Sequence, residues 1–156
     1  MVQSAPLQFG TADPEVSYKD RPAAFGVAPK GGRIALVKVS KPGSAPWFDL
    51  PGGAVEADET DAEALVREFG EETGLMVRAG VLLGRADQFM RKTDGEPVNN
   101  RSGLYRAEII GEAPALKCED DHELVWFEPE QALRRLRHDS HAWAVLAWLR
   151  AEAAAG

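Results

Sequence analysis

The stretch GAVEADETDAEALVREFGEETGL, residues 53–75, sets the organisation of this chain. Thr60 and Glu63 have the Thr-x-x-Glu spacing of a helix capping box, in which each residue bonds a free N–H of the first turn. Gly74 suits the left-handed residue that follows a helix end. We therefore predict a helix that starts at Thr60 and ends near Thr73, directly after the Pro51-Gly52-Gly53 turn.

Three glutamates on this helix, Glu68, Glu71 and Glu72, are spaced i, i+3 and i+4, so their carboxylates share one face. Like charges at this spacing repel by roughly a few tenths of a kcal/mol per pair, and by more when partly buried. A hard, oxygen-preferring cation such as Mg²⁺ would offset that repulsion. The alternative is a solvated helix on which Glu63 and Arg67 form an ordinary i, i+4 ion pair.

An apolar stripe is also predicted on this helix, which must pack against the rest of the domain. Its members are Ala62, Leu65, Val66 and Phe69. Glu72 would then lie nearest the border of the stripe.

The wider string resembles the Nudix box at every position that the box defines. It reads Gly53, five residues, Glu59, seven residues, and then Arg67-Glu68-Phe69-Gly70-Glu71-Glu72-Thr73-Gly74-Leu75. Because the pattern fixes residue types across such a long segment, it is far more specific than a short glycine motif. The resemblance implies a Nudix hydrolase of the α/β (α+β) class, with a mixed β-sheet between helices in an α/β/α sandwich.

The resemblance also implies roles for individual residues. Glu68, Glu71 and Glu72 would bind Mg²⁺ or Mn²⁺, the main chain of Gly53 would approach the metal, and Arg67 would hold the carboxylates by ion pairing. Such a metal neutralises phosphate oxygens and activates water, and a carboxylate within reach takes the proton of that water.

Other residues are assigned less directly. Glu59 would support the loop or reach a metal through water. The proton acceptor in this family is either a glutamate of the box or a carboxylate on a later loop, where Glu119 is the first choice. The other candidates on that loop are Asp120, Asp121 and Glu123, and a merely solvated acidic loop is the alternative. Arg21, Gly52 and Gly53 are expected to contact substrate, and His122 is a candidate phosphate contact.

The implied function is a Mg²⁺-dependent pyrophosphohydrolase that cleaves a nucleoside diphosphate linked to another moiety. Two alternatives stay open. One is a MutT-like diphosphatase of nucleoside triphosphates such as 8-oxo-dGTP. The other is a Nudix-fold sensor that binds a nucleotide without turnover, since a fold alone does not fix function.

The remainder of the chain predicts an N-terminal arm over residues 1–20 and a single domain over residues 21–156. Predicted strands are Ala23 to Ala28, Arg33 to Val39, Leu75 to Leu83, Ser102 to Ile110 and Glu123 to Phe127, with a hairpin turn at Pro29 to Gly32 and a long polar loop at Arg91 to Arg101. Two final helices are predicted, Pro129 to Arg137 and His141 to Ala153, the second capped by Asp139-Ser140 and packed through Ala142, Val145, Leu146 and Leu149.

Composition limits the partners of this chain. A net charge of −7 disfavours a nucleic-acid polymer or an anionic membrane surface, while a small phosphate could still bind through a cation. Cys118 is the sole cysteine, which excludes an internal disulfide. No apolar run approaches the length of a membrane span or a signal peptide, so we expect a cytoplasmic protein. A nucleotide-like small molecule is the expected partner, and a homodimer is common in such families.

Overall fold

The computed structural model describes residues 6–156 and places the chain in the α+β class. The helices and strands follow in this order: β1 Leu7–Phe9, β2 Lys19–Val27, β3 Pro29–Lys30, β4 Arg33–Val39, β5 Trp47–Asp49, β6 Gly52–Ala54, α1 Asp61–Thr73, β7 Leu75–Arg91, β8 Pro97–Glu112, the short 3-10 helix η1 Pro114–Leu116, β9 His122–Phe127, α2 Pro129–Arg135 and α3 Asp139–Ala155.

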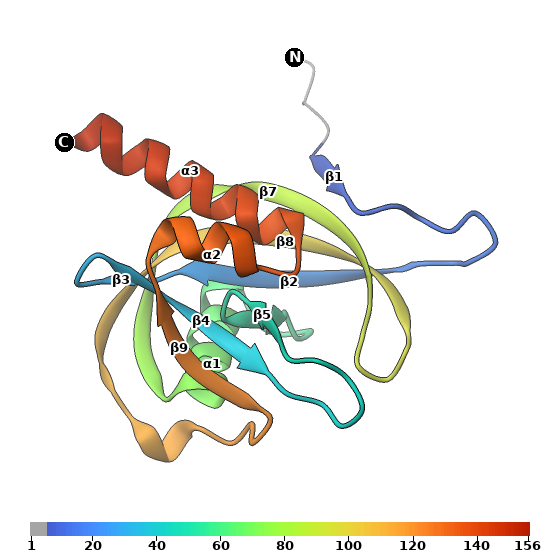
Figure 1. Cartoon of the computed structure of the whole chain (residues 1–156), viewed down its shortest axis with the longest axis horizontal. Helices are drawn as coiled ribbons and strands as arrows, with labels where there is room; N and C mark the ends of the chain where they lie inside the picture. The colour runs from blue at the N-terminus through green and yellow to red at the C-terminus, as the bar shows by residue number, and fades with distance from the viewer. Residues whose placement is uncertain (1–5) are drawn as a thin grey trace.

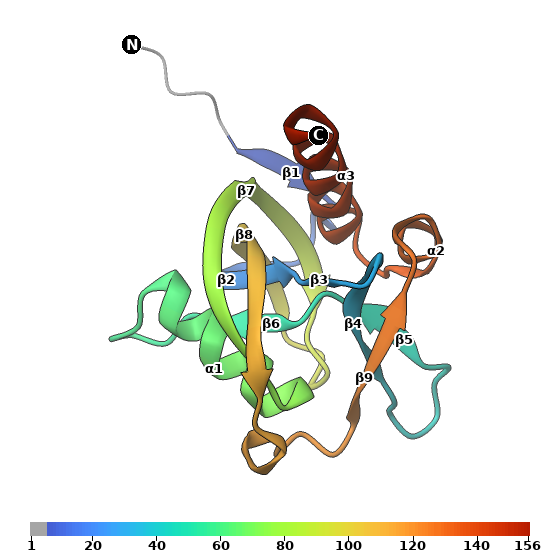
Figure 2. The same cartoon turned by 90° about the vertical axis from the view of Figure 1, so that its left-hand side faces the viewer.

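Two sheets form the centre of the molecule. The larger has the strand order β1-β7-β8-β2-β6, and it is mixed because β1 runs parallel to β7 and β2 parallel to β8. The smaller contains β3, β4 and β5, with β9 paired to β4. Helix α1 lies on one side of the sheets and helices α2 and α3 lie on the other (Figures 1 and 2). The predicted sandwich with a mixed sheet between helices is confirmed.

Each helical layer has its own apolar core. Leu65 and Phe69 of α1 are fully buried against Ala24, Ala35 and Ala107 on the strands beneath them. On the opposite side, α3 packs through other buried residues. Those on α3 are Ala144, Val145 and Trp148, and they meet Phe25, Ile34, Leu36 and Leu104. The sheets are thus apolar on both faces, as strands covered by helices on both sides must be.

The predicted boundaries of α1 are confirmed. The Thr60 hydroxyl accepts from the Glu63 N–H, the Glu63 carboxylate accepts from the Thr60 N–H, and Gly74 has the left-handed φ of 73°. The predicted apolar stripe is wrong in its rotation, because Ala62 is exposed and Val66 is 43% exposed. The buried side holds Ala64, Leu65, Phe69 and Glu72. Helix α1 therefore turns its carboxylate face further toward the sheet than amphipathic spacing alone predicts.

The first hairpin agrees with the sequence, whereas the predicted long polar loop is wrong. Gly31 and Gly32 form the turn between β3 and β4 with φ values of 59° and 80°, which suits glycine in a two-residue hairpin. In place of a loop at residues 91–101, β7 and β8 continue as a paired ladder to Arg91 and Pro97. Only the turn at residues 92–96 lies between these strands. Buried Asn99 and Asn100 gave this ladder a polar, loop-like sequence.

The last helix begins earlier than predicted and packs through a different stripe. Its N-cap is His138, whose side chain makes no capping bond, so the predicted Asp139-Ser140 cap is wrong. Leu146 of the predicted stripe is 52% exposed. The buried residues are instead Ser140, His141, Ala144, Val145 and Trp148. The His141 side chain enters the buried side because its Nδ1 accepts from the Leu50 N–H, and the Ser140 backbone N–H beside it donates to Gln88 Oε1. Hydrophobic spacing does not register such bonds. Helix α2 also ends before the predicted Arg137.

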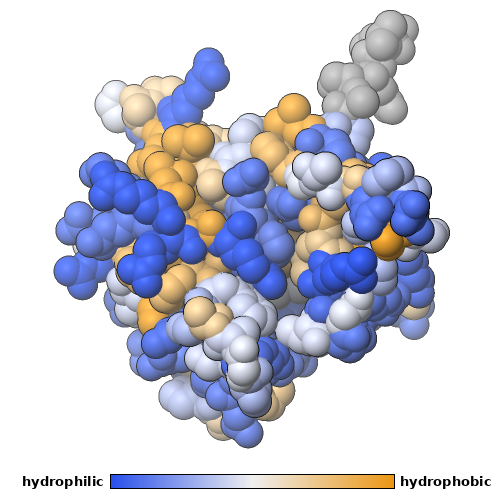
Figure 3. Space-filling model, turned by 45° about the vertical axis from the view of Figure 1, so that its right-hand side comes forward, coloured by the Kyte–Doolittle hydropathy of each residue, from blue (hydrophilic) through white to orange (hydrophobic). Residues whose placement is uncertain are grey.

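The surface mixes hydrophilic side chains with smaller hydrophobic areas on the face drawn in Figure 3. Within residues 6–156, none of the helices combines the length and the apolar character that crossing a bilayer would require.

Candidate active site

A glycine pair brings the main chain against the carboxylate face of α1. Gly53 pairs with Ala24 of β2, and a Cβ added to Gly53 would lie 2.7 Å from the carboxyl carbon of Glu68. Gly52 has φ +146°, and a Cβ there would lie 2.1 Å from the Ala24 carbonyl oxygen. Any larger residue would therefore displace either β2 or the glutamate. The two glycines place buried main chain directly beside Glu68, at the lining of a cleft described below.

Arg67 organises the carboxylates around it. Its Nε donates to Glu59 Oε2 at 2.7 Å, and its NH1 donates to Glu68 Oε1 at 3.0 Å and to Glu71 Oε2 at 3.2 Å. Its NH2 donates to the Ala54 carbonyl at 3.0 Å and to Glu59 Oε1 at 2.8 Å. The bond from Arg67 lowers the pKa of Glu59 to about 2. Glu59 thus supports Arg67, while Glu63 belongs to the capping box and not to the i, i+4 pair considered above.

Glu72 is the most deeply placed of the box glutamates. It is 6% exposed, its Oε1 accepts from the Gly52 N–H at 2.9 Å, and its Oε2 accepts from His122 Nε2 at 3.1 Å. Burial raises the pKa of Glu72, and the bonds from His122 and Gly52 oppose that rise. The carboxylate is held by donors on two sides.

Glu68 lies between the other charges of the site. Burial raises its pKa to about 7, the nearby Glu72 and Glu71 charges add to the rise, and Arg67 opposes it. One guanidinium is therefore shared by several carboxylates that remain mutually repulsive. Glu68, Glu71, Glu72 and the Gly53 main chain offer only oxygen donors, which are the ligand type that a hard divalent cation such as Mg²⁺ prefers.

A cleft of about 370 Å³ opens beside these glutamates. Its lining comes from both sheets, the loops and the end of α3: Arg21, Phe25, Val39, Lys41, Trp47, Asp49, Gly52, Gly53, Glu68, Glu72, Met90, Lys92, Thr93, Asp94, Asn100, Glu119, Asp121, His122, Arg137, His138 and His141. The structure thus brings the sequence-predicted Arg21, Gly52, Gly53, Glu68, Glu72 and Glu119 to one cavity. Arg67 and Glu71 support the cavity from the side of α1.

Arg21 is a half-buried cation at the acidic end of this cleft. Its NH1 donates to Asn100 Oδ1 at 3.0 Å. Burial lowers the pKa of Arg21, while the charges of Glu68, Glu96 and Glu72 raise it. The guanidinium thus faces the same space as the box glutamates, where a phosphate would meet both the cation and the carboxylate cluster.

The acidic loop divides into residues on the cleft and residues away from it. The N–H groups of Cys118 and Glu119 both donate to the Glu71 carbonyl, at 3.0 and 3.1 Å, which fixes the loop to the end of α1. Glu119 and Asp121 line the cleft, whereas Asp120 and Glu123 are exposed and outside its lining.

His122 bridges two carboxylates. Its Nε2 donates to Glu72, and its Nδ1 donates to Asp121 Oδ1 at 2.7 Å. The bond to Glu72 raises the pKa of His122 to about 9, and the bonds from Lys41 and His122 lower the pKa of Asp121 to about 2. A direct bond from His122 to a phosphate would have to replace one of these.

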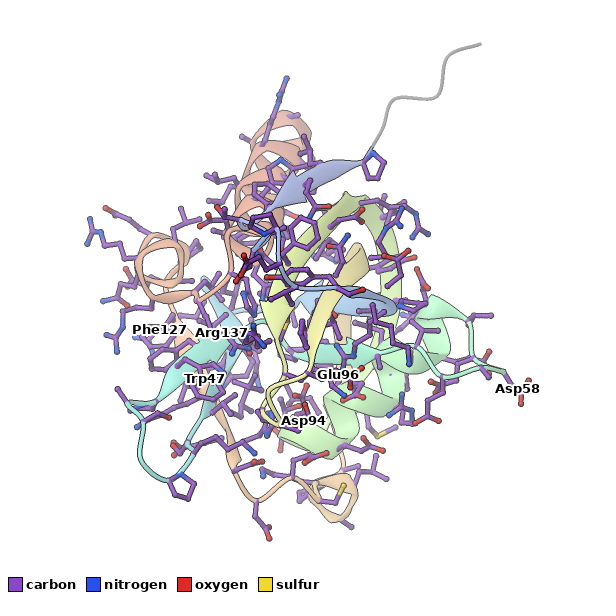
Figure 4. All side chains as sticks on the ribbon, turned by 90° about the vertical axis from the view of Figure 1, so that its right-hand side faces the viewer. Trp47, Asp58, Asp94, Glu96, Phe127 and Arg137 are labelled. Carbon is purple, nitrogen blue, oxygen red and sulfur yellow. The ribbon has the colours of Figure 1, made fainter. Side chains whose placement is uncertain are left out.

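The part of the cleft around Trp47, Asp49 and Arg137, which we call the neutral end, has a different chemistry. Arg137 donates to both oxygens of Asp49, at 3.2 and 2.8 Å, and its guanidinium carbon lies 4.6 Å from the centre of the Trp47 ring. His138 and His141 line this end, and burial lowers the pKa of both imidazoles, that of His138 to about 3. Figure 4 shows Trp47 and Arg137 together, away from Asp94 on the turn between β7 and β8.

Sequence reasoning missed Lys41, Lys92, Asp49 and Arg137 as cleft residues. Trp47 and Asn100 line the cleft as well, whereas Phe89 and Asn99 are outside its lining. The Asp49–Arg137 pair joins positions 88 apart in the sequence, so no local spacing could have predicted it.

Comparisons with known proteins agree with this geometry. The NUDIX domain model matches residues 19–149. The chain belongs to the NUDIX family. This Nudix chain is 35% identical to an ADP-ribose pyrophosphatase of Methanocaldococcus jannaschii over 75% of its own length and 66% of that relative. It is 28% identical to a CTP pyrophosphohydrolase of Escherichia coli, over 67% of this chain and 73% of that one.

A solved structure, the NUDIX hydrolase from Nitrosomonas europaea, superposes with a TM-score of 0.73 at 19% identity, over 85% of this chain and 90% of that one. At that identity the match supports the fold alone. The chain spans just under two thirds of the M. jannaschii relative. Together, the family match and the hydrolase relatives support the prediction of a Nudix hydrolase.

Proposed function

We propose that this chain is a Mg²⁺-dependent pyrophosphohydrolase that cleaves a nucleoside diphosphate linked to another moiety. The observation that carries the proposal is the surplus of partly and fully buried carboxylates beside the cleft. Arg67 bonds Glu59, Glu68 and Glu71 together, and Glu72 is buried nearby. Such an arrangement favours a bound cation, because the carboxylates otherwise repel one another.

The residues of the acidic end take separate roles in this proposal. Glu68, Glu71 and Glu72 hold the ion with the Gly53 main chain, and Arg67 keeps the first two carboxylates in place. When bound, Mg²⁺ neutralises phosphate oxygens and lowers the pKa of the attacking water. Glu119 lines the same cleft, and in this proposal it accepts the proton.

Arg21 and the glycine pair would receive the diphosphate. The Arg21 guanidinium can bond phosphate oxygens in a fork geometry, and being partly buried it loses less to solvent screening than a surface lysine. Gly52 and Gly53 have no side chains between the substrate and the main chain, so phosphate can approach closely.

The neutral end of the cleft suits the organic part of the substrate. Arg137 is neutralised by Asp49, and the buried histidines are uncharged, so this end offers rings and polar groups without net charge. A nucleoside fits these groups better than a further phosphate does. Hydrolysis of a nucleoside triphosphate in the MutT manner is the second candidate, and the similarity to a CTP pyrophosphohydrolase favours it.

The test is product release from a substrate panel with Mg²⁺, followed by anion-exchange chromatography. The panel contains ADP-ribose, nucleotide sugars, dinucleoside polyphosphates, nucleoside triphosphates and 8-oxo-dGTP, and Glu72→Gln is the blank. We expect turnover of the diphosphate-linked compounds to fall by roughly 1,000-fold in Glu72→Gln, because the amide is a poor ligand for Mg²⁺.

The fold of this variant is checked by its melting temperature. Gln can still accept the Gly52 N–H, and a neutral His122 can accept from the Gln amide, so the variant should melt close to the wild type. Full turnover by folded Glu72→Gln would remove the metal assignment. Nucleotide binding without turnover in the wild type would identify a sensor, and a preference for triphosphates would select the second candidate.

A further inference from the structure

The carboxylate of Glu72 is fixed from two directions by parts of the chain far from α1. The Gly52 N–H, on β6, bonds one oxygen at 2.9 Å, and His122 Nε2, on β9, bonds the other at 3.1 Å. Two donors on opposite oxygens define the plane of the carboxylate, and each oxygen keeps a lone pair for another partner. The orientation of Glu72 therefore depends on where His122 points.

His122 is itself held firmly. Its Nδ1 donates to Asp121 Oδ1 at 2.7 Å, and the other oxygen of Asp121 pairs with Lys41 Nζ. Backbone contacts join the same two segments. The Ser40 N–H donates to the Asp121 carbonyl at 3.0 Å, and His122 pairs with Val39 in the ladder between β4 and β9. The chain of contacts runs from Lys41 through Asp121 and His122 to Glu72.

The charges along this chain alternate. Carboxylates are acceptors, so a ring that bonds one at each nitrogen donates twice and is positively charged. Asp121 bonds both Lys41 and His122 Nδ1, and it thereby fixes the direction of the imidazole ring. The bond from Nε2 therefore reaches the Glu72 carboxylate from a set direction.

We propose that His122 is a positioning residue for the metal site: backed by Asp121 and Lys41, it holds the Glu72 carboxylate in the orientation in which it binds the divalent ion. This inference rests on the proposed function. A carboxylate this deeply buried gains by a fixed orientation, because it would otherwise lose rotational freedom at the moment of binding. Residues that bond metal ligands from behind affect metal affinity by on the order of 10–100-fold.

The experiment measures Mn²⁺ affinity by electron paramagnetic resonance of the free ion, with no substrate present. We compare the wild type with His122→Ala and His122→Gln, because the Gln amide can still donate to Glu72 from a position near that of Nε2. Glu123→Ala, on the exposed side of the same strand, is the matched control, and melting curves confirm that each variant is folded. Turnover is then measured at saturating Mn²⁺ with the compound that the wild type hydrolyses best.

We expect His122→Ala to weaken Mn²⁺ binding by roughly 10–100-fold, and His122→Gln to recover most of that loss. At saturating Mn²⁺, KM should change little in both variants, since His122 is proposed to act on Glu72 and not on the substrate. Unchanged Mn²⁺ affinity in folded His122→Ala would overturn the inference while leaving the proposed function intact. So would an equal loss in His122→Gln. Absence of Mn²⁺ binding by the wild type would overturn both.

Discussion

Two arginines bond carboxylate at the cleft, Arg67 behind its acidic end and Arg137 in its lining, and they differ in the balance of charge around them. At the acidic end, Arg67 is shared by Glu59, Glu68 and Glu71, so negative charge remains in excess. At the neutral end, Asp49 is the only carboxylate within residues 6–156 that pairs with Arg137, which also lies over Trp47. The same pair of residue types therefore builds a place for a cation at one end and an uncharged surface at the other.

This difference shows that the role of an ion pair depends on the other charges around it, and not on the pair alone. Arg67 and Arg137 make similar bonds, each with at least one donor distance of 2.8 Å or less. Arg67 has more carboxylates around it than its single positive charge can neutralise, whereas Arg137 does not. We expect substitutions at the acidic end to lower kcat, and substitutions at the neutral end to raise KM.

The largest of the effects that separate the two ends is predicted for Arg67→Ala. Loss of the guanidinium releases Glu59, Glu68 and Glu71 from fixed positions and leaves their repulsion uncompensated. We expect kcat/KM to fall by roughly 100-fold, equivalent to about 3 kcal/mol of transition-state stabilisation, with most of the fall in kcat. Steady-state kinetics at several Mg²⁺ concentrations measure this loss.

Arg67→Lys is the matched variant, because a lysine keeps the charge but cannot bond several carboxylates in a fork. It should recover only a small part of the activity. Wild-type kcat in either folded variant would break the comparison, because Arg67 would then be no more than a surface ion-pair partner.

The contrast between the two ends also explains how far the sequence could be interpreted. The acidic end is built mainly from one helix and the turn before it, so periodic spacing and the capping residues predicted the bounds of α1 and the shared face of its glutamates. Helical spacing did not predict how deeply Glu72 is buried. Its burial depends on bonds from Gly52 and His122, which lie on other strands.

The neutral end could not be predicted in the same way. It is assembled from β5 and the segment between α2 and α3, and each of its contacts joins residues far apart in the chain. Buried polar residues made two segments differ from the structure that their sequence pattern predicts. Asn99 and Asn100 suggested a loop where β8 runs, and His141 lies inside α3 on a side that hydrophobic spacing left outward. In each case a side-chain bond to another segment made the burial of a polar residue acceptable.

The second effect is predicted for the double substitution Asp49→Asn with Arg137→Gln. Removing both charges together keeps the end neutral, whereas removing Arg137 alone would leave Asp49 buried without its partner. The change removes the guanidinium that lies over Trp47, so the surface that receives the organic part of the substrate becomes less ordered. We expect KM to rise roughly 10-fold and kcat to stay within about threefold, as for a loss of uniform binding.

The same steady-state kinetics measure this change, and the melting temperature of the double variant serves as its folding control. A fall in kcat with KM unchanged would contradict the division of roles between the two ends. It would place Asp49 or Arg137 in the chemistry of the acidic end.

The smallest effect concerns the uncharged state of the histidines at the neutral end. Burial lowers the pKa of His138 to about 3, below the value near 6.5 expected in the unfolded chain. The unfolded state therefore binds more protons below pH 6.5, and the contribution of His138 to stability is complete above that pH and is lost as pH falls. Below pH 6.5 the free energy of unfolding falls by about 1.4 kcal/mol per pH unit because of this group.

His138→Asn isolates this contribution. His138 is the N-cap of α3 and makes no capping bond, while Asn is a favoured N-cap residue, so the variant should equal or exceed the wild type in stability at pH 7.5. Urea unfolding at pH 7.5 and 5.5 gives the free energy of unfolding of both proteins. His141 is present in both proteins and gives both the same dependence on pH. We therefore expect the wild type to lose about 1 kcal/mol more stability than the variant over this interval, because only the wild type has His138. Equal losses in the two proteins would mean that His138 gains a proton in the folded state. The end of the cleft around Arg137 would then become positively charged on acidification, and the contrast with the acidic end would hold only near neutral pH.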